Sequence, residues 1–269
     1  MFTIWQQPTE FQKERKLNMS KVDAMGFILR CQNWREIAVP IATHQKIPKI
    51  ILRNGFHFEA PAIHWYDVDE IIFNHGYNPL HLSIERNDIV VDIGANIGLF
   101  TVYAASRTQN TVYAFEPFPN NFEVLKQNIR ANGLNNVIPY RLAVSDKSGI
   151  ELLYVSEDYA GHRLKNVAAG KGGKYIEVPT TTLQDIMDSN NLEQIDFLKL
   201  DCEGAEGLIL ESTSKNYLKR VRKIAMEFHV ILLKFSPLDM RKLLEEGGFT
   251  TGIKWHPESP LGYLYGWRD

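Results

Sequence analysis

The sequence predicts an α/β protein built on a mostly parallel sheet with helices on both faces. Short, nearly continuous apolar runs alternate with helical segments from residue 88 onward, and a glycine-rich turn follows the first of these runs. The composition agrees with this class, because 44% hydrophobic and 23% charged residues are ordinary values for a globular chain. A chain of 269 residues buries a large core without staples.

Residues 1–76 are expected to form a helical and β-hairpin extension. A helix is expected after Ser20, a favourable N-cap, and Asn54-Gly55 between two apolar runs, 50–53 and 56–58, predicts a hairpin. The apolar stripe of the helical part comprises Val22, Met25, Ile28, Leu29 and Trp34. Positions 1–60 hold nine Lys or Arg against five Asp or Glu. We interpret the extension as packing on the domain behind it, or as a cap over a substrate site.

Residues 77–269 are expected to form the main domain, in which strands and helices alternate. The expected strands are 88–93, 111–115, 136–144, 195–200, 222–228, 249–254 and 262–267. The expected helices are 99–106, a second that is capped by Asn120 or Asn121 and ends at Asn132-Gly133, and a third from Ser236-Pro237 to Gly247-Gly248.

One segment interrupts the alternation. Residues 151–156 and 175–182 are expected as two extra strands, and the stretch 157–174 between them is rich in Gly and Lys. This stretch is interpreted either as the tip of a surface hairpin or as a lid beside the site, since long loops are often functional.

Composition excludes several classes of protein. Cys31 and Cys202 form no CxxC pair, which excludes a zinc ribbon or a disulfide framework and favours a reducing, cytoplasmic compartment. No leader peptide and no membrane span are expected. The net charge of −2 does not favour nucleic-acid binding, for which Lys165, Lys171 and Lys174 are the nearest candidates.

The turn after the first strand is the main chemical signal. It reads Asp92-Ile93-Gly94-Ala95-Asn96-Ile97-Gly98, which lacks the middle glycine of G-x-G-x-x-G and so disfavours an NAD site. A carboxylate beside a helix N-terminus suits a zwitterion such as the methionine part of S-adenosylmethionine.

The end of the second strand predicts an adenosine ligand. Glu116 lies 22 residues after Gly94, where an acidic side chain can accept from two ribose hydroxyls. Pro117 ends the strand, and Phe118 can lie against the adenine.

Four motifs together resemble the FkbM-type methyltransferases, over roughly residues 77–230. They are Val91 to Gly98, Phe115-Glu116-Pro117, Ala143-Val144-Ser145, and Asp196 to Glu206 with its Lys-x-Asp-x-Glu-Gly-x-Glu block. The resemblance implies a class I fold of seven strands with the last one antiparallel. It also implies methylation of a hydroxyl oxygen on a sugar or secondary metabolite.

The same resemblance implies a set of cofactor contacts. Ala143 and Val144 would border the adenine, and Tyr77 would close over the cofactor. With the residues named above, the candidate cofactor-binding set is Tyr77, Asp92, Gly94, Ala95, Asn96, Gly98, Glu116, Pro117, Phe118, Ala143, Val144 and Asp201.

The candidate catalytic residues are Asp201, Glu203, Glu227 and His229. Positions 227 and 229 share one face of a strand, and an imidazole has the pKa of a general base at neutral pH. We expect His229 as the base, with the three carboxyl groups orienting the acceptor. Glu203 and Glu206 are also typical of a helix N-terminus, where they would only cap it. Cys202 is expected to be a small buried residue.

These ligands also leave a divalent cation such as Mg²⁺ as an open alternative. The first interpretation is an S-adenosylmethionine-dependent O-methyltransferase acting on a hydroxyl or carboxyl oxygen of a small molecule, glycan or peptide natural product. The alternatives are a peptide methyl-ester-forming enzyme, an NAD-dependent enzyme, and a protein that only binds the cofactor. An adjoining domain in a longer protein also stays open.

Overall fold

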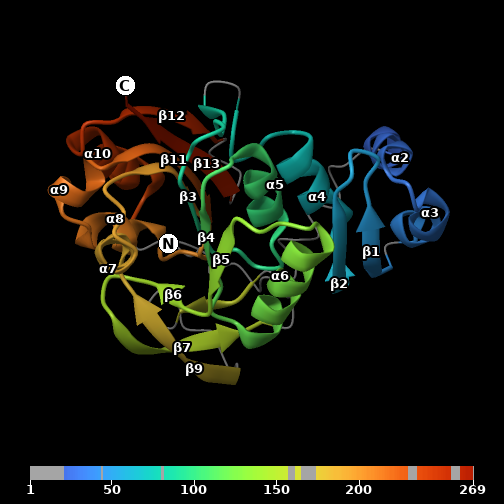
Figure 1. Cartoon of the computed structure of the whole chain (residues 1–269), viewed down its shortest axis with the longest axis horizontal. Coiled ribbons are helices and arrows are strands. Elements are labelled where there is room, and N and C mark those ends of the chain that lie inside the picture. The colour runs from blue at the N-terminus through green and yellow to red at the C-terminus, as the bar shows by residue number, and fades with distance from the viewer. Residues whose placement is uncertain are drawn as a thin grey trace, which may run out of the picture. The chain divides into compact units, whose positions relative to one another are not determined.

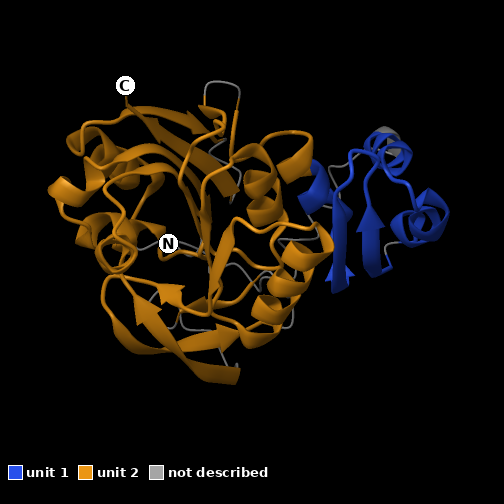
Figure 2. Cartoon of the chain, viewed as in Figure 1, with its two compact units in different colours: residues 1–69 blue, residues 70–269 orange. Residues whose placement is uncertain are grey.

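The computed structural model describes residues 21–43, 45–79, 82–156, 161–164, 174–229, 235–255 and 261–268. The chain divides into two compact units, Met1–Asp69 and Glu70–Asp269 (Figure 2). This boundary lies earlier than the sequence-based boundary between residues 76 and 77.

The first unit contains two helices and a two-stranded sheet. The helices are α2 (Lys21–Arg30) and α3 (Trp34–Ala42), the strands are β1 (Ile47–Ile51) and β2 (His57–Ile63), and α4 (Trp65–Ile72) crosses into the second unit. The predicted hairpin is confirmed, because β1 and β2 pair antiparallel and Gly55 adopts a φ of +100° in the turn.

The predicted apolar stripe of the first unit is wrong in part. Met25 and Leu29 are 58% and 66% exposed, whereas Phe27 and Cys31 are fully buried. Both pairs have the spacing of one helix face, so periodicity alone could not choose between them. Trp34 begins a second helix instead of continuing the first. Ser20 and the side chain of Val22 lie outside the described residues.

The second unit is built on a sheet of seven strands in the order β12-β13-β11-β10-β3-β4-β5 (Figure 1). Their bounds are β3 (Val90–Ile93), β4 (Val112–Phe115), β5 (Val137–Tyr140), β10 (Ile195–Leu200), β11 (Val221–His229), β12 (Thr250–Lys254) and β13 (Leu261–Trp267). β13 runs opposite to the other six strands of this sheet, which confirms the expected topology.

Helices cover both faces of the seven-stranded sheet. Figure 1 shows α5 (Leu99–Arg107) and α6 (Pro119–Ala131) beside each other on one face. Three helices pack with the main core on the other face: α7 (Leu183–Ser189), α8 (Glu206–Ser212) and α10 (Pro237–Glu246). A short helix, α9 (Lys215–Leu218), follows α8. No helix within these described ranges is long and apolar enough to cross a bilayer.

The start of α6 differs from the prediction. Phe118 occupies the N-cap position, and no side chain caps the helix. Pro119, at the first position, has a φ that suits a helix and no N–H group that would need a cap. Asn121 is buried and donates to the Asn96 side chain at 3.1 Å instead of capping. The predicted end is confirmed, since Gly133 follows the helix with a φ of +64°.

The predicted third strand, 136–144, divides between two sheets. Residues 137–140 form β5, whereas β6 (Ala143–Val144) pairs with β9 (Lys174–Thr181) in a four-stranded sheet of order β6-β9-β7-β8. Ala143 changes sheet because it packs with Leu153, Leu164 and Val178 in a separate apolar cluster.

The two predicted extra strands are confirmed as β7 (Gly149–Val155) and β9. Between them, β8 (Arg163–Leu164) pairs with β7. Residues 157–160 and 165–173 lie outside the described part of the chain, so the lid interpretation and the roles of Lys165 and Lys171 stay predictions.

We expect Leu198→Ala to lower the free energy of unfolding by about 2–5 kcal/mol, because Leu198 is fully buried at the centre of the sheet. Ile138→Ala, on the edge strand β5 at 42% exposure, should cost less than about 1 kcal/mol. Denaturant titration of both variants measures the difference. Equal losses would contradict this placement of the core.

Candidate active site

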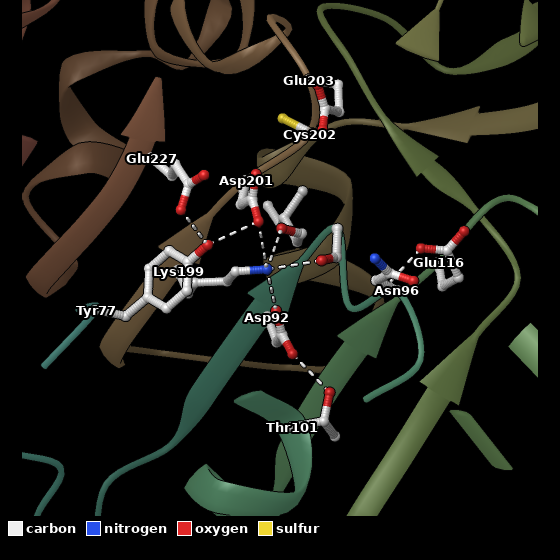
Figure 3. Close-up of polar contacts among 12 residues, drawn as sticks. Tyr77, Asp92, Asn96, Thr101, Glu116, Lys199, Asp201, Cys202, Glu203 and Glu227 are labelled. Atoms are coloured by element: carbon white, nitrogen blue, oxygen red, sulfur yellow. Dashed lines mark hydrogen bonds and ion pairs between the residues drawn. The ribbon is translucent and has the colours of Figure 1, made fainter. Parts of the chain in front are cut away.

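The carboxyl ends of four neighbouring strands, β3, β4, β10 and β11, gather ionisable side chains at one edge of the sheet (Figure 3). Asp92 lies in β3 and Lys199 in β10, and Asp201 directly follows β10. Glu116 follows β4, and Glu227 lies in β11. Parallel pairing brings these ends together, so residues far apart in sequence share one site.

Lys199 is the centre of this arrangement. Its ammonium lies 3.1 Å from Asp92 Oδ1 and 3.7 Å from Asp201 Oδ2, and it donates to the Gly94 carbonyl at 2.6 Å. Burial by itself would lower the pKa of Lys199, but the carboxylates of Asp92 and Asp201 raise it above its usual value. Lys199 therefore carries a permanent positive charge inside the site. Sequence reasoning gave it no role, although a lysine in an otherwise apolar strand was a usable signal.

Asp92 is completely buried and already partnered. Thr101 on α5 donates to Asp92 Oδ2 at 2.5 Å, and Lys199 neutralises the other oxygen. A ligand ammonium would have to share this carboxylate with Lys199. The cofactor contact expected of Asp92 therefore stays a prediction.

The glycine turn holds β3 against the end of β10. A Cβ on Gly94 would lie only 1.8 Å from the Asp201 carbonyl oxygen, and Gly94 has a φ of +77°. A Cβ on Gly98 would lie 2.6 Å from Leu125 Cδ1. Packing against backbone thus requires Gly94, whereas Gly98 is favoured by its left-handed φ of +91°, and buried Ala95 lies between them.

Glu116 is fixed by two backbone donors. The Asn96 N–H donates to Oε2 at 2.9 Å and the Phe118 N–H donates to Oε1 at 2.8 Å. Asn96 reaches this position with a left-handed φ of +52°, which asparagine tolerates. Burial raises the pKa of Glu116 to about 7. Each oxygen keeps a further lone pair for another donor.

The residues expected around an adenine lie partly together. The half-buried ring of Phe118, which follows Pro117 at the start of α6, packs with the cluster that contains Ala143. The centroid of the His162 ring lies 4.0 Å from the centroid of the Phe118 ring. Val144 packs instead with the main core.

The candidate catalytic carboxyl groups and His229 form a second cluster beside Lys199. His229 Nε2 lies 3.6 Å from Glu227 Oε1 and 3.9 Å from Glu203 Oε2, beyond hydrogen-bonding distance. Burial raises the pKa of Glu203 to about 8. Burial would lower the pKa of His229, but Glu203 and Glu227 raise it above 6.5.

Glu206 has a structural position. It is fully buried, and its Oε1 accepts from the N–H of Cys202 at 2.8 Å and of Gly204 at 3.3 Å. The helix-terminus interpretation therefore fits Glu206. Cys202 itself is half-buried.

Three ligand atoms of Asp201, Glu203 and His229 lie within 4.8 Å of one another, close enough to meet on one divalent cation. The Lys199 ammonium already supplies a positive charge beside Asp201. We assign no metal here, and the divalent cation stays an open alternative.

Tyr77 is brought into the site from outside the strands. Its hydroxyl contacts Asp201 and Glu227, at 2.7 and 2.9 Å, and its ring lies 5.3 Å from the Lys199 ammonium. The structure thus brings Tyr77, Asp92, Asp201, Glu203, Glu227 and His229 into one connected cluster around Lys199.

Comparisons with known proteins identify a family for this chain. A family model described as the methyltransferase FkbM domain matches residues 92–251. The hexuronic acid methyltransferase AglP of Haloferax volcanii is 31% identical over 170 residues, which cover 63% of this chain and 66% of that protein. The 31-O-demethyl-FK506 methyltransferase FkbM of Streptomyces tacrolimicus is 27% identical over 193 residues, which cover 60% of this chain and 71% of that protein.

A solved structure supports the fold. The methyltransferase FkbM from Methylobacillus flagellatus KT matches with a TM-score of 0.50 at 16% identity, covering 90% of this chain and 57% of that chain. Together with the strand order, this similarity identifies the class I methyltransferase fold.

We expect Lys199→Met to lower the free energy of unfolding by about 3–5 kcal/mol, because it leaves the buried Asp92 carboxylate without its cation. Lys215→Met is the matched control. Its side chain is 69% exposed and pairs with Glu246 only at 3.9 Å, so it should cost about 0–1 kcal/mol. Similar losses in denaturant titration would contradict a structural role for Lys199.

Proposed function

The chain belongs to the FkbM-domain methyltransferases, and on that premise we propose that it transfers a methyl group from S-adenosylmethionine to an oxygen atom of its acceptor. Family membership makes the chain a methyltransferase, which sets aside an NAD-dependent enzyme and a protein that only binds a cofactor.

The Glu116 carboxylate is the observation that carries the cofactor proposal. Its two oxygens are held by the Asn96 and Phe118 N–H groups, and each retains acceptor capacity, as the two hydroxyls of one ribose require. Phe118, which packs beside Ala143, supplies an apolar surface for the adenine.

The charge of the site also fits this cofactor. Asp92 and Asp201 lie around the ammonium of Lys199, and the carboxyl groups of Glu203 and Glu227 add oxygen acceptors, so the described part of the site suits a ligand with cationic or hydrogen-bond-donating groups. S-adenosylmethionine carries both a sulfonium and an ammonium, and it supplies an electrophilic methyl group. Alignment of the acceptor and exclusion of water are then the tasks of this chain.

We propose a hydroxyl rather than a carboxylate as the methyl acceptor. A carboxylate would have to enter beside Asp201, whose charge would repel it, and beside the carboxyl groups of Glu203 and Glu227, to which it has no proton to donate. A hydroxyl can donate to these groups, and His229 can take its proton as the acceptor oxygen bonds to the methyl carbon. The electron pair of the broken carbon–sulfur bond remains on sulfur, which balances the charge.

The chemical class of the acceptor is proposed more broadly. The relatives are named for a hexuronic acid and for 31-O-demethyl-FK506. We propose a small molecule, glycan or peptide natural product, with peptide methyl-ester formation as the alternative. A cytoplasmic location is supported by Cys31 and Cys202, which are both free thiols.

We expect S-adenosylhomocysteine to bind with micromolar affinity in calorimetric titration, and NAD⁺ to give no signal. Asp92→Ala and Glu116→Ala should abolish the binding, whereas Glu123→Ala should not, because Glu123 is 58% exposed and pairs with Lys126 on the surface of α6.

The same titration has a proton signature. Because burial raises the pKa of Glu116 to about 7 and ribose hydroxyls favour its ionised form, binding near neutral pH should release a proton and weaken as the pH falls. The number of protons released is measured by repeating the titration in buffers of different ionisation enthalpy. The Glu116→Gln variant should release no proton on binding. NAD⁺ binding instead would contradict the proposed cofactor.

His229→Ala should lower the rate of methyl transfer by about 10²–10⁴-fold and leave S-adenosylhomocysteine affinity unchanged. In the wild type, kcat/KM should rise with pH through an apparent pKa above 6.5, as His229 loses its proton. The measurement is a pH series with candidate hydroxyl and carboxyl acceptors, run with and without EDTA. A carboxyl acceptor with no loss in His229→Ala would support the ester alternative, and loss of activity in EDTA would support a divalent cation.

A further inference from the structure

A buried tyrosine hydroxyl joins two carboxyl groups at the edge of the sheet. Tyr77 Oη lies 2.7 Å from Asp201 Oδ2 and 2.9 Å from Glu227 Oε2, and Figure 3 shows it between them. Its ring is held by edge contacts with Phe100 at 5.4 Å and Tyr263 at 5.6 Å. The hydroxyl is therefore fixed between both carboxyl groups.

The two short contacts need two protons, one for each contact. A tyrosine and two ionised carboxylates contain only one, on the tyrosine hydroxyl. A phenol has one proton to donate, and an ionised carboxylate can only accept. If both carboxyl groups were ionised, Tyr77 could satisfy one of them, and the other contact would oppose lone pairs at less than about 3 Å. Ionisation of Tyr77 would remove the one proton that the three groups share, and burial, and then Asp201, raise its pKa well above the usual value.

The surroundings place the additional proton on Glu227 rather than on Asp201. The Lys199 ammonium, 3.7 Å from Asp201 Oδ2, stabilises the ionised form of Asp201. The Glu227 side chain is 8% exposed against 25% for Asp201, so the loss of hydration on ionising is larger for Glu227. His229 Nε2 lies 3.6 Å from Glu227, and Glu203 competes for the imidazole at 3.9 Å.

We propose that Glu227 is a neutral carboxylic acid at neutral pH, that it donates its proton to Tyr77 Oη, and that Tyr77 donates in turn to Asp201. The chain of donors then runs in one direction, from Glu227 on β11 to Asp201 beside Lys199. Every contact in it has one proton.

The consequence for catalysis rests on the proposed function. A neutral Glu227 removes the charge of one of the carboxyl groups that face His229; the others are Glu203, Asp201 and Glu206. The imidazole then loses its proton at a lower pH and is available to take the proton of the acceptor hydroxyl. Tyr77 is thus a positioning residue that acts on His229 through Glu227.

Carbon-13 NMR of the full chain labelled at the glutamate side-chain carboxyl carbon tests the protonation state without any substrate. Glu227 is assigned as the resonance lost in Glu227→Gln. We expect it at the chemical shift of a protonated carboxyl group at neutral pH, while aspartate labelling places Asp201, assigned by Asp201→Asn, at the ionised shift. A Glu227 resonance that titrates near the usual pKa of about 4.3 would overturn the proposal.

Tyr77→Phe tests the link to His229. Without the hydroxyl, the Glu227 resonance should move toward the ionised shift, and the pH limb of kcat/KM should move up by about 1 unit. Tyr140→Phe is the matched control, because its hydroxyl contacts only Asn190 at 2.6 Å among the described residues. Circular dichroism checks that both variants fold.

The double variant Tyr77→Phe with Glu227→Gln separates a proton effect from a packing effect. The neutral amide should return the pH limb toward its wild-type position, whereas a purely structural defect would persist. A limb that does not move in Tyr77→Phe would refute the link to His229. The NMR result stands apart from the methyl-transfer assay, so failure of the proposed function and failure of this inference give different outcomes.

Discussion

The ammonium of Lys199 is the interaction on which the site depends. It lies within a completely buried part of the sheet and neutralises Asp92, whose carboxylate would otherwise be an isolated charge away from water. It also reaches the Gly94 carbonyl and Asp201, so one cation links β3, the glycine turn and the end of β10. More carboxyl groups than cations lie at this edge of the sheet. The fold can hold them there because the Lys199 ammonium stays charged at neutral pH.

In the proposed function, cofactor binding and proton transfer belong to different strand ends around this centre. At the turn after β3 and the end of β4, two backbone N–H groups hold Glu116, which suits the neutral, hydroxyl-rich part of a ligand. The ends of β10 and β11 present titratable groups, including His229. Because these four strand ends belong to adjacent parallel strands, a ligand bound beside Glu116 is held at a fixed position relative to His229.

Sequence was most informative where backbone and burial decide the outcome. The hairpin at Asn54-Gly55 and strand 195–200 follow from turn chemistry and an apolar run, the antiparallel last strand follows from the family resemblance, and the structure has all three. It failed where two patterns had equal periodicity, as for Met25 and Phe27, and where a buried asparagine bonded across elements, as for Asn121. The contacts of Tyr77 with Asp201 and Glu227 span 124 and 150 residues, which no local pattern encodes.

The switch of the chain from β5 to β6 has an evolutionary consequence. Ala143 and the Phe118 ring belong to a cluster supported by the four-stranded sheet, whose hydrogen bonds are separate from those of the seven-stranded sheet. Insertions or deletions between β7 and β9 can therefore alter one wall of the site while Lys199, Asp92 and Asp201 keep their places.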